Sequence, residues 1–179
     1  MQNYAFIDMQ NVYLSLQQQG WKIDWLRLRK HLHKKYRATK AYIFIGYIAR
    51  NKRLYEFLES CGFSLIFKPV NVLAGGIVKG NVDAELVLQA MIDLDDYDKA
   101  IIISGDGDFG CLVKHLRKIN KLQQVIAPSI AHSSRQLRSA AGPYFSQLND
   151  IRHLLEHTEK TKGRSFATGR NAQNPTSPS

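Results

Sequence analysis

Five short apolar runs alternate with longer segments of helical periodicity, and this alternation constrains the fold more than any other feature. The runs are rich in β-branched and aromatic residues and span residues 4–7, 41–47, 64–67, 100–103 and 122–127. Strands separated by helices form right-handed βαβ units that build a parallel sheet, and runs that are apolar throughout are typical of strands covered on both faces. The sequence therefore predicts an α/β fold with a parallel sheet of about five strands in the order 3-2-1-4-5.

The segments between the runs carry apolar residues at helical spacing. One begins after Asp24, a residue type that caps helix N-termini. Another starts near Asn51 and is closed by Gly62. The predicted inner faces include Trp25, Leu28 and Leu32, then Val82, Leu86 and Ala90, then Leu112, His115, Leu116 and Ile119.

Two stretches depart from this alternation. Residues 69–81 form a glycine-punctuated stretch with no clear structure, and a loop of that length is often functional. Residues 158–179 are polar and basic, which predicts a disordered tail. The expected organisation is one domain over residues 1–157 followed by this tail.

The charge balance favours a polyanionic partner. Lys and Arg number 25 against 15 Asp and Glu, a formal net charge of +10. A field of this sign attracts nucleic acid and speeds its encounter with the protein.

Cysteine content and hydropathy point to a reducing compartment. Cys61 and Cys111 form neither a disulfide framework nor a C-x-x-C metal pattern, and both are expected to be buried apolar residues. The N-terminus lacks the pattern of a signal peptide, and no apolar run is long enough to span a bilayer. We expect a cytoplasmic protein without membrane contact.

Carboxylates and polar groups follow two strands that the predicted order makes neighbours. Ligands bind beyond the carboxyl ends of parallel strands, where the winding direction reverses. Asp8 ends the first strand and Asp83 opens the helix before the fourth strand. The other candidates at this edge are Asn11, Ser104, Asp106 and Asp108.

Several carboxylates close together raise one another's pKa unless a cation neutralises them. Mg²⁺ or Mn²⁺ suits oxygen ligands, and beside a basic surface such an ion can support phosphodiester hydrolysis. At two positions the carboxylate could instead have a purely structural role in stabilising a helix. Asp8 is also placed to cap a helix, and Asp83 would gain from the helix dipole. By contrast, Asp93, Asp95, Asp96 and Asp98 precede the fourth strand and predict a solvated turn at the opposite edge.

The segment GDGDFG from Gly105 to Gly110 satisfies the pattern of a dinucleotide-binding loop. Two aspartates in that loop would repel a pyrophosphate, and the next run ends in Ala-Pro-Ser without the acid that binds ribose. We therefore expect no nicotinamide cofactor. A protein kinase would need a catalytic H-R-D motif that is missing, and a haloacid-dehalogenase phosphatase would need a second aspartate two residues after Asp8.

The segments AFIDMQNVY, KGNVDAELVLQAM and IIISGDGDFGCLVKHL follow one another along the chain. Together they resemble the NYN domain, specifically the LabA-like branch of the PIN-like nuclease group, over residues 4–155. The resemblance implies a three-layer α/β/α fold and metal-dependent RNA cleavage that leaves 5′-phosphate and 3′-hydroxyl ends. It places the acidic site on Asp8, Asp83, Asp106 and Asp108, with Asn11 nearby. Met9 and Gln89 stand where relatives carry glycine and an acid.

The sequence supports two functional hypotheses. The first is an endoribonuclease in which Mg²⁺ or Mn²⁺ is held by the four aspartates and the substrate is single-stranded RNA. Its candidate RNA-binding residues are Arg27, Lys30, Lys34, Lys79, Arg117 and Lys118. The second, motivated by Met9 and Gln89, is a PIN-like regulator that binds RNA or protein with little or no turnover. The sequence leaves both a monomer and a homodimer open.

Overall fold

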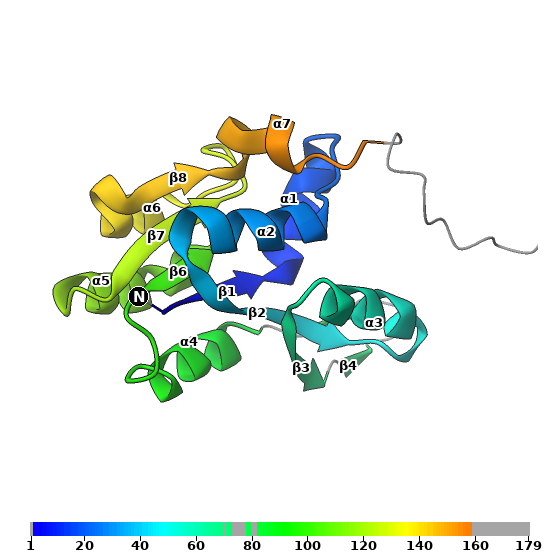
Figure 1. Ribbon diagram of the computed structural model, residues 1–179, viewed down its shortest axis with the longest axis horizontal. Coiled ribbons are helices and arrows are strands. Elements are labelled where there is room, and N and C mark those ends of the chain that lie inside the picture. The colour runs from blue at the N-terminus through cyan, green and yellow to red at the C-terminus, as the bar shows by residue number, and fades with distance from the viewer. Residues whose placement is uncertain (1, 70, 73–77, 80–81, 159–179) are drawn as a thin grey trace, which may run out of the picture.

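Six parallel strands form the central sheet of the computed structural model, which describes residues 2–69, 71, 72, 78, 79 and 82–158 (Figure 1). Their order is β3-β2-β1-β6-β7-β8, and every neighbouring pair is parallel. The strands are β1 (Asn3–Asp8), β2 (Ala38–Tyr47), β3 (Ser64–Pro69), β6 (Ala100–Ile103), β7 (Leu122–Ala127) and β8 (Phe145–Gln147). The predicted α/β fold and strand order are confirmed, with one further strand at the edge.

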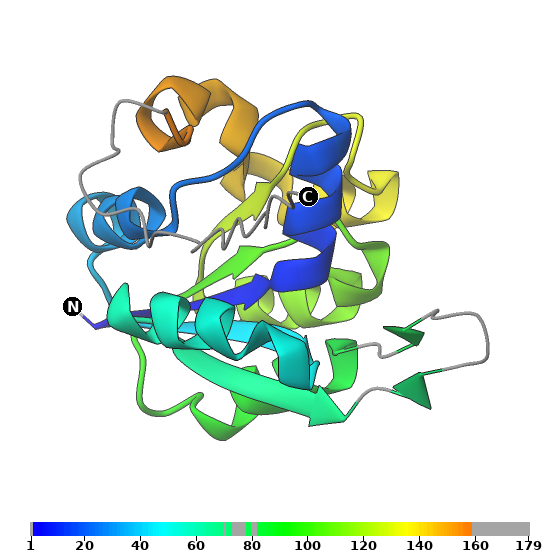
Figure 2. The same cartoon turned by 90° about the vertical axis from the view of Figure 1, so that its right-hand side faces the viewer.

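Helices cover both faces of the sheet, so that the domain has three layers (Figures 1 and 2). One face carries α1 (Met9–Gln18), α2 (Trp25–Tyr36), α3 (Lys52–Ser60) and α7 (Arg152–Leu155). The other carries α4 (Asp83–Ile92), α5 (Gly110–Lys118) and α6 (Arg135–Ala141). No helix in the described part of the chain is both long and apolar enough to cross a membrane.

The pleat of each strand divides its side chains between two cores. Ala5 and Ile7 of β1 face the layer of α1 and α2, whereas Tyr4 and Phe6 face the layer of α4, α5 and α6. Both sets are buried, so residues 4–7 of β1 form an uninterrupted apolar run, as expected for a strand covered on both faces.

The predicted helix ends are present. The Asp24 carboxylate accepts a hydrogen bond from the Arg27 amide at 3.0 Å and caps α2. Gly62, with φ of +90°, follows α3 in the left-handed region that glycine adopts readily.

Four predicted environments are wrong. Cys111 is exposed, and so are His115 and Ile119. A 3₁₀ turn, η2 (Gly107–Phe109), precedes α5, and the inner line of that helix continues from it as Phe109, Leu112, Val113 and Leu116. Asp93 is buried rather than solvated, because it accepts hydrogen bonds from the Tyr42 hydroxyl at 2.5 Å and the Gln89 amide at 2.9 Å.

The glycine-punctuated stretch contains a short antiparallel pair, β4 (Asn71–Val72) and β5 (Val78–Lys79). Its residues 70, 73–77 and 80–81 lie outside the described residues, as do residues 159–179 of the predicted tail. The structure therefore leaves the expected disorder of the tail as a prediction.

Candidate metal centre

Asp8 stands at the carboxyl end of β1 and caps α1. Its Oδ1 accepts a hydrogen bond from the Asn11 amide at 3.1 Å, and its Oδ2 accepts one from the Ser104 hydroxyl at 3.1 Å. Only 4% of Asp8 is exposed, and Ser104 is completely buried. The helix-cap interpretation of Asp8 is therefore correct, and the same carboxylate also belongs to a polar network that joins β1 to β6.

That network continues into the turn after β6. The Ser104 hydroxyl accepts a hydrogen bond from the Asp106 amide at 3.1 Å, and Asp106 Oδ1 accepts one from the Asp108 amide at 3.0 Å. Asn11 fixes the same turn from α1, because its Oδ1 accepts the Gly105 amide at 2.8 Å. The predicted supporting residues Asn11 and Ser104 thus hold the backbone that carries Asp106 and Asp108.

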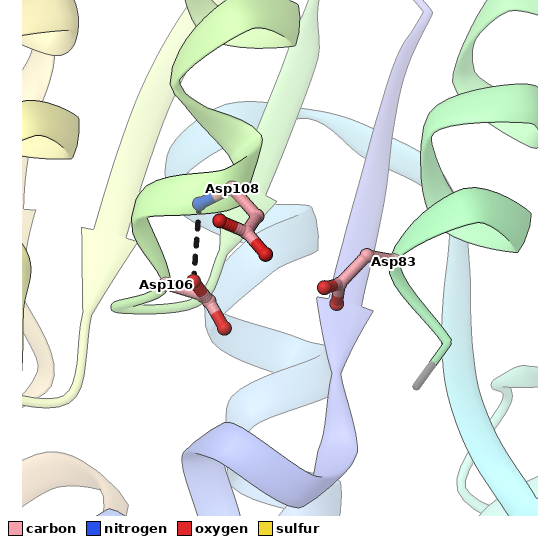
Figure 3. A group of neighbouring side chains, drawn as sticks. All are labelled: Asp83, Asp106 and Asp108. Atoms are coloured by element: carbon pink, nitrogen blue, oxygen red, sulfur yellow. Dashed lines mark hydrogen bonds between the residues drawn. The ribbon is translucent and has the colours of Figure 1, made fainter. Parts of the chain in front are cut away.

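Three carboxylates converge at this edge of the sheet. Asp83, Asp106 and Asp108 each offer an oxygen, and these oxygens lie within 4.8 Å of one another. Figure 3 shows Asp83 reaching from the first turn of α4 toward the two aspartates of the β6–α5 turn. Oxygen ligands from separate elements at this spacing suit a hard divalent cation such as Mg²⁺ or Mn²⁺. Asp8 is not one of these three residues, but Ser104 joins its carboxylate to the Asp106 amide.

Gly105 and Gly107 of the GDGDFG segment allow the β6–α5 turn to pack closely against the loop before α6. A Cβ at Gly105 would lie 1.9 Å from the His132 carbonyl oxygen, and one at Gly107 would lie 2.7 Å from Ser134 Oγ. The Gly105 carbonyl in turn accepts the Ser134 amide at 2.9 Å. Glycine is needed here because the β6–α5 turn presses against the loop before α6, so a bound pyrophosphate is not required to explain the pattern.

Burial raises the pKa of Asp8 to about 6, although the hydrogen bonds from Asn11 and Ser104 lower it. The negative charges of Asp83 and Asp106 add to the rise. A carboxyl group with this shift is half protonated near pH 6, and its ionisation at neutral pH is unfavourable in the folded protein. A cation bound beside it would offset that cost.

We expect Asp8→Asn to stabilise the metal-free protein at neutral pH. Below the unfolded pKa of 3.8 the Asp8 carboxyl is protonated in both states, and stability falls as pH rises toward about 6. The full difference in pKa corresponds to about 3 kcal/mol. Asparagine keeps the cap and carries no charge, so a gain of about 2 kcal/mol is expected at pH 7.5 in EDTA and little at pH 4. Urea unfolding at both pH values measures it, and an unchanged or lower stability at pH 7.5 would contradict the charge argument.

The predicted RNA-binding residues divide among different surfaces. Arg27 pairs with Asp24 at 3.4 Å and donates to the Glu156 carbonyl at 3.1 Å. Lys30 and Lys34 line a hollow of about 230 Å³ on the layer of α2 and α3. Arg117 and Lys118 lie at the end of α5, in the layer of α4 and α6. Lys79 belongs to β5, and its side chain is outside the described residues.

Other residues beside the carboxylates escaped the sequence interpretation. Ser134 caps α6 with hydrogen bonds to the Gln136 and Leu137 amides, and the Gln136 side chain lies 3.5 Å from a Cβ placed at Gly110. A serine before an apolar helical segment is a detectable capping signal. Glu85, in the first turn of α4, pairs with Lys68 at 3.1 Å.

Comparison with known proteins settles the family. The model of the NYN domain matches residues 4–152, which is most of the chain. The chain belongs to the NYN domain family. Within this PIN-like, nuclease-type family, the chain is 27% identical over 175 residues to the Low amplitude and bright protein LabA of Synechococcus elongatus, covering 87% of this chain and 88% of that protein.

A solved structure supports the fold of this NYN domain independently. A crystal structure of a protein of unknown function from Vibrio parahaemolyticus superposes with a TM-score of 0.70 at 23% sequence identity. The match covers 87% of this chain and 96% of the other. The sequence-based family assignment, including its LabA-like character, is confirmed.

Proposed function

We propose that this NYN domain is a metal-dependent endoribonuclease that hydrolyses phosphodiester bonds of single-stranded RNA. The observation that carries the proposal is the convergence of Asp83, Asp106 and Asp108 within 4.8 Å at the carboxyl ends of β1 and β6. Ligand sites of open parallel sheets form at such a reversal point. The net charge of +10 supports a polyanionic substrate.

The donor set fits a divalent cation. It consists of carboxylate oxygens, and the burial of Asp8 makes added positive charge favourable. We assign Asp83, Asp106 and Asp108 as ligands of Mg²⁺ or Mn²⁺. Asp8 is a fourth carboxylate, joined to Asp106 by the hydrogen bonds of Ser104. When bound, such an ion supplies electrostatic stabilisation of the charge that develops on the reacting phosphate.

The chain's own residues position that chemistry. The Ser104 hydroxyl donates to the Asp8 carboxylate and accepts from the Asp106 amide, so it ties the Asp8 side chain to the backbone of Asp106. Asn11 anchors the turn through the Gly105 amide. Prearranged charges of this kind need no reorganisation when the substrate reacts. By family analogy, the products would carry 5′-phosphate and 3′-hydroxyl ends.

The two positions that motivated a regulator lie away from the three carboxylates. The Met9 side chain is buried in the core with α1 and α2. Gln89 bonds Asp93 near the C-terminal end of α4, six residues from Asp83. Because neither residue replaces one of the three carboxylates, we favour the ribonuclease over the regulator.

The direct test is a time course with end-labelled single-stranded RNA and the full chain in Mn²⁺, Mg²⁺ or EDTA. We expect internal cuts in either metal, none in EDTA, and slower cutting of a duplex of the same sequence. Binding of the RNA without cleavage in any divalent metal would contradict the enzyme and favour the regulator.

A further inference from the structure

A basic groove lies between α5 and α6. A hollow of about 400 Å³ lies there, lined by Lys114, Arg117, Lys118, Ser139 and Ala140. Lys114, Lys118 and Ser139 are exposed, and the two lysines stand one helical turn apart on the same face of α5. These five residues define the α5–α6 groove.

The groove is part of a segment without negative charge. Residues 109–149 contain six Lys or Arg and neither Asp nor Glu. Within the described parts of the chain, the recorded ion pairs leave both Lys114 and Lys118 without a carboxylate partner. Both ammonium groups are therefore available to an external anion.

The Arg117 side chain lines the groove and is held in place by contacts with α6 and Gly142. Its Nη1 donates to the Ala140 carbonyl at 3.2 Å, which ties α5 to α6. The guanidinium also packs against Gly142, where a Cβ would lie 2.8 Å from Nη1. Gly142 has φ of +56°, a backbone conformation that glycine adopts readily. The remaining N–H groups of Arg117 keep their capacity to donate to an anion.

Helix α5 connects the groove to the turn that carries two of the carboxylates. α5 begins directly after Asp108 and Phe109, so Lys114 and Lys118 stand about 6 Å and about 12 Å along its axis from Gly110. α6 borders the same turn, because Ser134 at its cap meets Gly107. The α2–α3 hollow with Lys30 and Lys34 belongs to the opposite layer, with the sheet between.

We propose that the α5–α6 groove binds the sugar–phosphate backbone of the RNA strand, on one side of the phosphodiester that reaches the carboxylates. Lys114 and Lys118 each contact a phosphate, and Ser139 donates its hydroxyl to the same strand. Such contacts position the strand and carry no sequence information. This inference rests on the proposed ribonuclease function, because it takes its ligand from that reaction.

The test compares two double variants that each remove two positive charges. The groove variant, Lys114→Gln with Lys118→Gln, removes both lysine charges from the groove. The control variant, Lys35→Gln with Arg37→Gln, removes two exposed charges near the C-terminal end of α2, at the other edge of the sheet. Affinity for fluorescein-labelled single-stranded RNA is measured in EDTA by anisotropy over a range of salt. In single strands each phosphate contact contributes about 0.7 to the slope of log affinity against log salt.

We expect the groove variant to bind RNA at least tenfold more weakly and to lose about 1.4 of the salt slope. The RNA affinity of the control variant should stay within about twofold of wild type. Equal losses in both variants would overturn the inference, as would a larger loss from Lys30→Gln with Lys34→Gln. A groove-dependent affinity in a protein that cuts no RNA would support the groove and refute the enzyme.

Discussion

Replacing Asp106 by asparagine should lower kcat/KM for RNA cleavage at least about a hundredfold, with the fold intact. The substitution removes one of the three converging carboxylates. Asparagine retains an oxygen that can accept the Asp108 amide, so η2 keeps its cap. The loss should appear in kcat in both Mn²⁺ and Mg²⁺, while RNA affinity in EDTA changes little.

Asp95→Asn is the matched control for that substitution. Asp95 is an exposed carboxylate in the turn after α4, near the amino ends of the strands, and its replacement changes the charge equally. It should leave cleavage within about twofold of wild type, as expected for a surface position. Comparable activities for Asp106→Asn and wild type would refute the assigned site.

Gly105→Ala should destabilise the protein by about 3 kcal/mol and abolish cleavage. The new Cβ would meet three backbone atoms of the next loop, the closest being the His132 carbonyl oxygen at 1.9 Å. Backbone cannot rotate away as a side chain can, so the two loops must separate. Separation breaks the hydrogen bond from the Ser134 amide to the Gly105 carbonyl and strains the one from Gly105 to Asn11.

Gly110→Ala tests whether this effect is specific to the loop contact. A Cβ at Gly110 has its nearest neighbour at 3.5 Å, an ordinary contact, and alanine favours the helical backbone of α5. We expect unchanged or slightly higher stability in urea unfolding. A Gly105→Ala variant as stable as the Gly110→Ala variant would show that the loops adjust without cost.

The sequence predicts the sheet because each strand carries its own signal. Apolar runs bounded by turn residues located five of the six strands of the sheet, and the order followed from right-handed crossovers. β8 escaped because it is three residues long with half-buried side chains, so neither length nor hydrophobicity distinguishes it. The strand order alone also predicts that Asp8 and Asp106 lie at one edge of the sheet.

The contacts between distant loops could not be predicted. Gly105 meets His132, and Tyr42 bonds Asp93 across 51 positions of sequence, so no local pattern reveals either pair. In α5 the apolar periodicity correctly placed Leu112 and Leu116, but Val113 is buried where His115 and Ile119 were expected. Basic residues were visible in the sequence, but their division between the two faces of the sheet required the fold.

Mn²⁺ binding without RNA tests most directly whether α4 and the β6–α5 turn jointly hold one divalent cation. Titration of Mn²⁺, followed by electron paramagnetic resonance, would compare the wild type with Asp83→Asn and Asp95→Asn. We expect saturable binding in the wild type and in Asp95→Asn, and binding at least tenfold weaker in Asp83→Asn, because Asp83 is the carboxylate that α4 contributes. Equal Mn²⁺ affinity in Asp83→Asn and wild type would contradict the shared site.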